Sequence, residues 1–192
     1  MNHAGNRNEV LPSPVLGMMI FIGTEVMFFC GLISAFLVIR AGTAFWPPPG
    51  QPRLPVEATA FNTLVLLASG VTVFLAGRAL AAPDGAARAR KLAGLTILLG
   101  AFFVLFQGYE WVRLLDFGLR LSSSLYGGLF YVIIGAHAFH VMAALAFLAW
   151  VWVNMIEGEQ GEAGAHLFAA ARLFWYFVVA VWPVLYGLVY LY

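Results

Sequence analysis

Five long runs of apolar residues, separated by short polar segments, limit what this chain can fold into more than any other feature. A bilayer core of ~30 Å needs about 20 apolar residues for each helical crossing, and each run is long enough to provide one. Backbone polar groups cannot stay unpaired in lipid, and the runs lack the alternation of barrel strands, so helices are expected. The sequence therefore predicts an all-α integral membrane bundle, a single membrane domain over residues 1–192, with five transmembrane helices at about 15–39, 58–77, 92–112, 125–156 and 167–192.

The composition excludes two broad classes of protein. Hydrophobic residues make up 62% of the 192 residues and charged residues only 10%, against roughly 25% charged residues in an ordinary soluble domain. The formal net charge of +1 provides no electrostatic attraction toward nucleic acid. A soluble globular fold and nucleic-acid binding are therefore set aside. The single cysteine, Cys30, also excludes an internal disulfide and every metal or haem-attachment motif that needs two cysteines.

The distribution of Lys and Arg over the connecting segments indicates how the helices are oriented, because short cytoplasmic loops carry an excess of these residues. Six of the ten fall on the side of the N-terminus, and four of those six crowd into one connection, between the second and third helices. We therefore expect a cytoplasmic N-terminus and an external C-terminus. The side of the N-terminus holds Arg7, Arg78, Arg88, Arg90, Lys91 and Arg172, and the other side holds Arg40, Arg53, Arg113 and Arg120. Of these, Arg172 is predicted to lie at the start of the last helix.

The first loop contains three consecutive prolines in the segment Trp46-Pro47-Pro48-Pro49-Gly50. Proline fixes φ and lacks a backbone N–H, so this segment cannot be helical and favours a stiff, extended connection. In the expected orientation it forms a rigid external strap, called the proline strap below.

Glu25 is the residue that is most costly to place in the predicted bundle, since it lies about ten residues into the first apolar run. At ~1.5 Å per residue, that position is near the middle of the membrane and out of reach of water. A carboxyl there must either hold a proton or be hydrogen-bonded by a neighbour. Two interpretations stay open: a proton-handling or lipid-headgroup site, and a neutral carboxylic acid that bonds across helices.

His137 and His140 share one face of the fourth predicted helix, because residues three apart lie on the same side. Apolar residues extend this face, so it is expected to face other helices. A metal or haem site would need further ligands from neighbouring helices, but the other histidines, His3 and His166, are predicted to lie in loops. Hydrogen bonding between helices is therefore favoured over metal ligation, and both residues are candidate partners of Glu25.

Three further polar residues lie within predicted helices and are expected to support the bundle. Gln107 and Glu110 share a face of the third helix, and Glu110 also precedes Arg113 at the spacing of a local ion pair. Asn62 lies in the second helix, where an amide typically hydrogen-bonds across to another helix.

A series of short motifs runs through the first loop and all five predicted helices. They are Gly23-Thr24-Glu25-Val26-Met27-Phe28-Phe29; Trp46-Pro47-Pro48-Pro49-Gly50; Glu57 with Phe61-Asn62-Thr63; Gln107 with Glu110-Trp111; Tyr126, Phe130-Tyr131, Gly135, His137 and His140-Val141; and Trp175, Phe177-Val178 and Trp182. In this order and spacing, they resemble subunit III of the haem-copper (cytochrome c) oxidases, in the five-helix form of bacterial complexes. The resemblance covers about residues 13 to 192.

This resemblance implies a non-catalytic subunit with no active site of its own, in a bacterial inner-membrane respiratory complex that reduces oxygen and translocates protons. The expected partners are the haem-bearing subunit I, subunit II and other respiratory-complex subunits, which would hold the haem and copper. Members of the family hold phospholipids between helices, support proton uptake and prolong the life of the catalytic subunit. By motif match, Glu25, His137 and His140 are the residues expected to carry this role. No constellation of nucleophile and base, and no phosphate-cradling loop, points to a reaction of this chain's own.

One departure from the family pattern is found in the last helix, where Tyr176 and Val179 stand at positions that are commonly His and Asp. Two polar partners in the bundle are thereby lost. The departure leaves open a divergent branch, such as the subunit III-like protein associated with nitric oxide reductases. A small transporter and a purely structural or assembly subunit also stay open as hypotheses, although the broken helices and inverted repeats of transporters are not visible.

Overall fold

The computed structural model describes residues 12–49, 54–122, 124–157 and 161–191. These residues form α1 (Ser13–Ala41), α2 (Val56–Leu80), α3 (Ala86–Asp116), α4 (Leu125–Glu157), α5 (Glu162–Tyr186) and a closing π-helical turn, η1 (Gly187–Leu191). Five helices are long and apolar enough to cross a membrane, and the described residues contain no strand. The predicted all-α bundle of five crossings is therefore confirmed.

Proline and glycine set several of the helix boundaries. Pro12 and Pro55 immediately precede α1 and α2, where their fixed φ suits a helix start. Between α2 and α3 the chain turns through Asp84, which has a φ of +56°, and Gly85 is the N-cap of α3. Pro183 lies inside α5, one turn before the α-helix gives way to η1 at Gly187.

Two helices begin at least five residues earlier than the sequence predicts. Ala86 starts α3 rather than residue 92, and Glu162 starts α5 rather than residue 167. Each first turn contains a charged residue, Arg88 in α3 and Glu162 in α5, among small residues, so both turns lie outside the apolar runs although their backbone is helical. Two placements were consequently wrong: His166 lies within α5 and not in a loop, and Arg172 lies ten residues after the first residue of α5 and not at its start.

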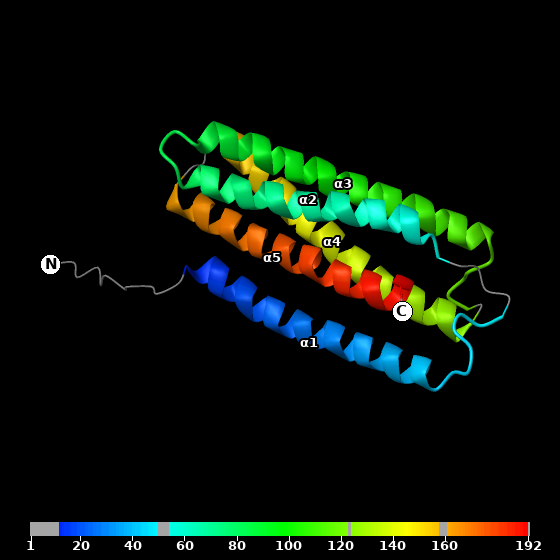
Figure 1. Cartoon of the computed structure of the whole chain (residues 1–192). Coiled ribbons are helices and arrows are strands. Elements are labelled where there is room, and N and C mark those ends of the chain that lie inside the picture. The colour runs from blue at the N-terminus through cyan, green and yellow to red at the C-terminus, as the bar shows by residue number, and fades with distance from the viewer. Residues whose placement is uncertain (1–11, 50–53, 123, 158–160, 192) are drawn as a thin grey trace.

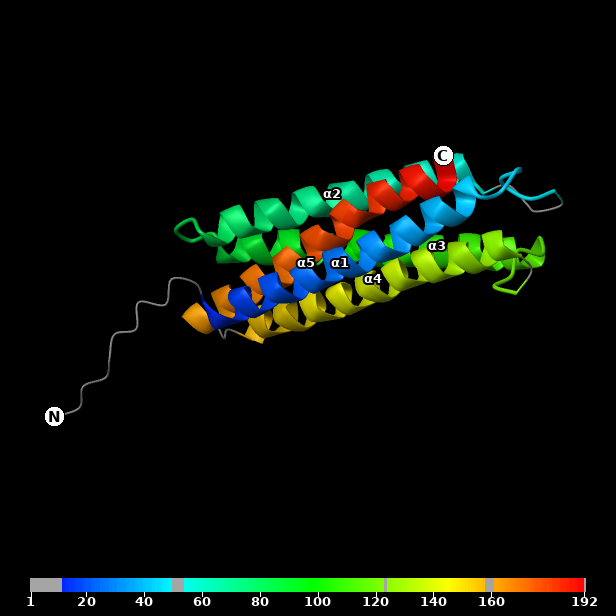
Figure 2. The same cartoon turned by 90° about the horizontal axis from the view of Figure 1, so that it is seen from below.

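α5 lies at the centre of the bundle and packs against α4, α1 and α2, as Figures 1 and 2 show. In the most apolar stretch of α5, 50% of the residues are buried inside the bundle, whereas in that of α1 only 11% are buried. α2 and α3 form the most extensive helix pair, and α1 lies along α5 with only a few contacts to α4. α1 is therefore a peripheral helix. Because it has few contacts with α4, a single hydrogen bond between these two helices contributes a large share of their attachment.

The core between the antiparallel helices α2 and α5 is fixed by two tryptophans of α5, Trp175 and Trp182, both fully buried. The Trp175 indole donates a hydrogen bond to Ser69 Oγ at 3.1 Å, and the Trp182 indole donates one to Thr63 Oγ1 at 2.8 Å. A buried indole N–H is costly without an acceptor, so the two bonds favour one register of α5 along α2.

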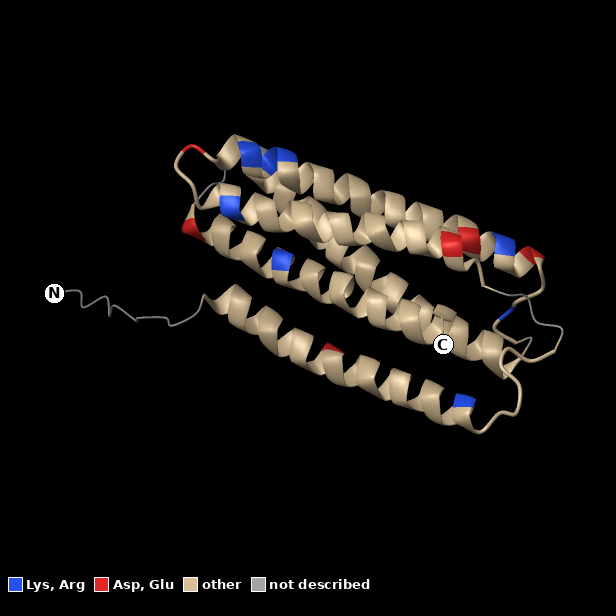
Figure 3. Ribbon diagram, viewed as in Figure 1, with Lys and Arg blue, Asp and Glu red and all other residues tan. Residues whose placement is uncertain are grey.

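Charged residues lie mainly at the two ends of the bundle (Figure 3). We call the end that carries Arg78, Arg88, Arg90 and Lys91 the basic end; the proline strap lies at the other. Which end faces the cytoplasm stays a prediction. Arg7, Gly50 and Arg53, to which the sequence also assigned places, lie outside the described residues, as do His3 and Tyr192.

Candidate functional site

The buried carboxyl of Glu25 finds its partner on α4. Glu25 Oε2 lies 2.8 Å from His140 Nε2, and the two side chains are only 17% and 11% exposed. Glu25 follows the start of α1 by 12 residues, or ~18 Å of helix, which places it near the middle of the span. The predicted pairing of Glu25 with a histidine is thus present, and it links the peripheral helix α1 directly to α4.

The other ring nitrogen of His140 limits where protons can be. His140 Nδ1 lies 2.7 Å from the carbonyl oxygen of Ala136, which can only accept a hydrogen bond, so Nδ1 carries a hydrogen. One further proton then makes the 2.8 Å bond between His140 Nε2 and Glu25 Oε2. It sits either on the carboxyl, leaving both groups neutral, or on the imidazole, forming an ion pair. In either state the pair has no net charge, which suits a low-dielectric interior.

Aromatic rings enclose the pair on the side of the bundle. Phe29, one helical turn after Glu25, is 3% exposed and meets the His140 ring edge-on, with centroids 5.3 Å apart. The same phenyl ring lies 6.0 Å from the ring of Phe177 on α5. Phe28, which is exposed on the outer surface of α1, also lies near the imidazole, with centroids 6.0 Å apart. These rings keep water away and hold the imidazole in place for the carboxyl.

His137 does not join the pair. It is 1% exposed, its ring stacks on that of Trp182 at a centroid distance of 5.0 Å, and neither ring nitrogen has a hydrogen-bond partner. It lines a cavity of about 160 Å³ between α3, α4 and α5, together with Gln107 and Trp111. Of the two histidines predicted as partners of Glu25, only His140 is positioned for that role.

The supporting polar residues form a separate cluster nearer the proline strap. Asn62 Nδ2 donates to the Phe103 carbonyl oxygen at 3.1 Å and lies 3.5 Å from Gln107 Oε1, which links α2 to α3 as predicted. Gln107 Nε2 donates to the Tyr190 hydroxyl at 3.3 Å, which links α3 to η1. Glu110, one turn further along α3, is 4% exposed and lies 3.9 Å from the guanidinium of Arg113, so the local ion pair is also present.

The departures in the last helix create new contacts in place of the lost polar ones. Val179 packs at Gly70 of α2, where an added Cβ would lie 3.1 Å from Val179 Cγ1. The Tyr176 hydroxyl accepts a hydrogen bond of 3.4 Å from Arg172 Nη2, one turn earlier on α5. Val179 therefore packs against α2, whereas Tyr176 bonds within α5.

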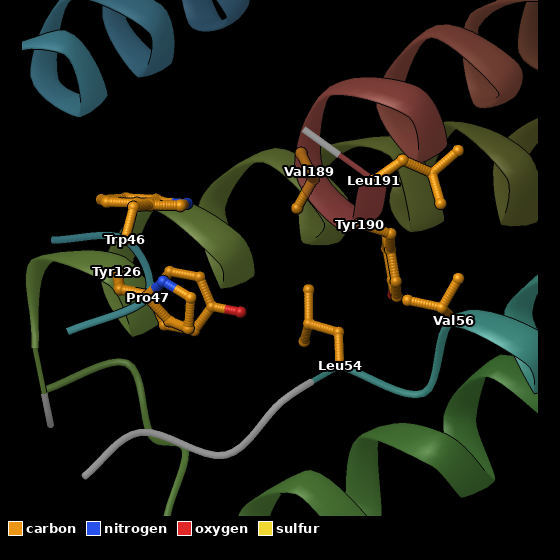
Figure 4. Close-up of a pocket in the computed structure, with 8 residues that line it drawn as sticks. All are labelled: Trp46, Pro47, Leu54, Val56, Tyr126, Val189, Tyr190 and Leu191. Atoms are coloured by element: carbon orange, nitrogen blue, oxygen red, sulfur yellow. The ribbon is translucent and has the colours of Figure 1, made fainter. Parts of the chain in front are cut away.

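A second hollow lies at the proline-strap end, between the first loop, the start of α4 and η1 (Figure 4). Its volume is about 290 Å³, and Trp46 forms one wall, with its ring 5.1 Å from that of Tyr126. The Tyr126 hydroxyl points toward the middle of the hollow (Figure 4). No carboxyl or imidazole is among the described residues that line it, so it offers no acid and base pair of the kind that Glu25 and His140 form.

Within the described ranges, no three His, Cys, Asp or Glu side chains gather closely enough to hold a metal ion. The expectation that this chain binds neither haem nor copper stays a prediction. Sequence reasoning did not single out Tyr190 or the partnership of Arg172 with Tyr176. Tyr190 sits in an apolar run with no distinguishing pattern, whereas an arginine within an apolar run is a signal that could have been weighed as Glu25 was.

Comparison with known proteins agrees with the resemblance of the motifs. The family model described as cytochrome c oxidase subunit III matches residues 3–192. Cytochrome c oxidase subunit 3 of Synechocystis is 32% identical over 178 residues, which is 92% of this chain and 75% of the relative. The probable cytochrome c oxidase subunit 3 of Nocardia farcinica is 33% identical over 189 residues, 98% of this chain and 91% of the relative. The cytochrome c oxidase subunit 3 of Corynebacterium diphtheriae is 34% identical over 196 residues, which cover 93% of this chain and 92% of the relative.

Proposed function

This chain belongs to the cytochrome c oxidase subunit III family, and we propose that it works in its complex as a non-catalytic, lipid-binding and stabilising subunit through the Glu25–His140 pair. As a subunit III of a haem-copper oxidase with five apolar helices, it is a multi-pass membrane protein that associates with other oxidase subunits. Its relatives are named as oxidase subunits, which favours the oxidase over a nitric oxide reductase-associated protein or a transporter.

In this proposal, the chain lies in the bacterial inner membrane beside subunit I, which carries the haem-copper chemistry, and with subunit II and other respiratory subunits. It holds no haem or copper itself, and it binds phospholipid. The N-terminus faces the cytoplasm, as the basic residues of the α2–α3 connection favour. The chain thereby supports oxygen reduction and proton translocation that take place in its partners.

The 2.8 Å hydrogen bond between His140 Nε2 and Glu25 Oε2 is the single observation that carries the proposal. Because Ala136 fixes the hydrogen on Nδ1, one proton is shared between Nε2 and the carboxyl. That proton can move from one atom to the other without creating net charge in the membrane. Uptake or release of a proton, by contrast, changes the net charge of the pair by one, and in this proposal that exchange is the proton-linked role of the pair, which also ties α1 to the bundle.

Replacing Glu25 by Gln tests this role in the purified complex. Gln keeps the size of the side chain and can still hydrogen-bond His140, so we expect the subunit to assemble normally. It cannot ionise, so we expect slower proton uptake during turnover, or fewer turnovers before the oxidase loses activity. Glu110→Gln is the matched control, because Glu110 is a buried carboxyl that lies beside Arg113 rather than a histidine.

Three measurements decide the outcome: copurification of the oxidase subunits, proton uptake in proteoliposomes, and the number of turnovers before inactivation. A Glu25→Gln complex equal to wild type in all three would overturn the proton-linked role and leave a purely structural bond. Glu25→Ala should in addition weaken assembly, because it leaves His140 Nε2 without a partner.

A further inference from the structure

Arg172 places a positive charge unusually far inside the bundle. It follows the first residue of α5 by ten positions, whereas every other described Lys or Arg lies in a loop or within five residues of a helix end. Charged residues inside a transmembrane segment are costly, and they commonly have a partner that the function requires. Arg172 therefore calls for an anionic partner of its own.

The described residues do not supply a carboxylate for this guanidinium. Their ion pairs within 4.0 Å join Glu110 to Arg113 and Glu25 to His140. Arg172 Nη2 donates to the Tyr176 hydroxyl at 3.4 Å, while Nε is buried and has no hydrogen-bond partner. The Phe168 and Tyr176 rings lie 5.7 and 5.8 Å from the guanidinium carbon, which eases the burial of the cation but leaves its charge in place.

The guanidinium of Arg172 lies against the last turn of α2. It packs against Gly77 of α2 so closely that an added Cβ at that glycine would overlap its Nη1 and Cζ atoms. Gly77 is three residues before the end of α2 at Leu80, or ~4.5 Å along the helix axis. The charge of Arg172 thus lies beside the last turn of α2, close to the end of that helix, although its own position is well inside α5.

Other cations at this end strengthen the case for an anion in the membrane surface. Arg78 neighbours Gly77, and Arg88, Arg90 and Lys91 begin α3 at the same end (Figure 3). The carboxyls with described side chains at this end are Asp84 and Glu162, and neither forms an ion pair with Arg172; the sequence adds Glu157, the last residue of α4, and Glu159, in the connection from α4 to α5. The net charge of this end is thus only slightly positive, and the attraction for an anionic headgroup comes from single cations near the surface, each of which adds to it.

We propose that Arg172 and Tyr176 bind the phosphate of an anionic phospholipid at the junction of α5 and α2 beside Gly77. The planar guanidinium can donate two parallel hydrogen bonds to phosphate oxygens. The Tyr176 hydroxyl accepts from Arg172, so its own hydrogen is available to the same phosphate. Glycine at position 77 leaves the room in which the guanidinium lies. This inference rests on the lipid-binding part of the proposed function and is independent of the Glu25–His140 pair.

The test measures phospholipid retained by the whole oxidase complex, purified through a tag on this chain. The complex is equilibrated in mixed micelles with equal amounts of phosphatidylglycerol and phosphatidylcholine, and the bound lipids are counted by native mass spectrometry. We expect the wild type to retain phosphatidylglycerol preferentially and Arg172→Gln to lower its affinity about tenfold, the usual effect of losing a hydrogen bond to a charged group. Arg78→Gln, which removes another positive charge at the same end, is the matched control and should lower phosphatidylglycerol retention less than Arg172→Gln does, because it removes attraction but no hydrogen bond to the phosphate.

Each other outcome has a distinct meaning. Equal retention by wild type and Arg172→Gln overturns this site alone, whereas a wild type that retains no phospholipid overturns the lipid-binding part of the proposed function as well. Displacement of the lipid by millimolar inorganic phosphate identifies a site for free anions and overturns the assignment to a lipid headgroup. If the Arg172→Gln complex loses a partner subunit while its lipid retention is unchanged, Arg172 pairs with a carboxylate of that subunit, and the proposal is overturned too. If Arg172→Gln fails to assemble, Arg172→Lys decides, because Lys keeps the positive charge but lacks the planar guanidinium that donates two parallel hydrogen bonds. Reduced phosphatidylglycerol retention by Arg172→Lys supports the site, and unchanged retention refutes it.

Discussion

Replacing Gly100 by alanine should destabilise the bundle, because Gly100 is a point of very close approach between α3 and α5. A Cβ added at Gly100 would lie 2.5 Å from Cη2 and 2.8 Å from Cζ2 of Trp175, and 3.0 Å from Leu145 Cδ1. Carbon atoms in contact are normally about 3.5–4.0 Å apart, so the indole ring would have to move by about 1 Å.

The indole has little freedom to make that movement. Trp175 is fully buried, and its N–H is held by Ser69 of α2 at 3.1 Å. Overpacking a close-packed site typically costs about 1–3 kcal/mol. Gly108→Ala is the matched control, because Gly108 lies on the same helix and an added Cβ would meet nothing within 4 Å. We therefore expect Gly100→Ala to lower the free energy of unfolding by about 1–3 kcal/mol relative to Gly108→Ala.

Unfolding of the purified full-length chain by sodium dodecyl sulfate in mixed micelles, followed by circular dichroism, measures this difference. A double-mutant cycle adds a second check. Phe in place of Trp175 lacks the two atoms that clash, so Gly100→Ala should cost less on that background. Equal stability of Gly100→Ala and Gly108→Ala would refute the reasoning, since it would mean that the indole and its helix move aside freely.

Two predictions concern the chain as a whole. With Cys30 replaced by serine, a cysteine at Pro49 should react with an impermeant maleimide added outside intact cells, and one at Gly85 should not; the reverse pattern would show that the basic end is external. The separately expressed chain should show no stoichiometric haem band and no copper by metal analysis, and a haem band would contradict its role as an accessory subunit.

The residues of the candidate site were predictable to different degrees. Glu25 stood out in the sequence because a carboxyl near mid-membrane is costly wherever its helix packs, so its need for a partner was independent of tertiary structure. The choice between His137 and His140 was not predictable. Residues three apart differ by about 60° around a helix, and the packing of α4 decides which imidazole meets α1 and which turns to Trp182.

Arg172 illustrates the opposite case. Its position near a predicted helix start suggested an ordinary interfacial cation, because the apolar run begins only at Leu167. The helix in fact begins at Glu162, so the charge lies well inside α5 rather than in its first turn. Hydropathy measures how apolar a segment is, and it does not detect turns of small and charged residues that continue the same helix beyond the apolar run.

The sequence by itself determined that this chain is a bundle of five membrane helices, because each crossing must satisfy its own backbone hydrogen bonds and does so without help from its neighbours. The motifs determined the family in the same way, since their order along the chain needs no structure to be seen. Tertiary structure decided the rest. All five helices are apolar on nearly every side, so periodicity does not indicate which face packs where. The contacts of the buried tryptophans with α2, the meeting of Glu25 with His140 and the placement of Arg172 at Gly77 depend on how the helices fit together.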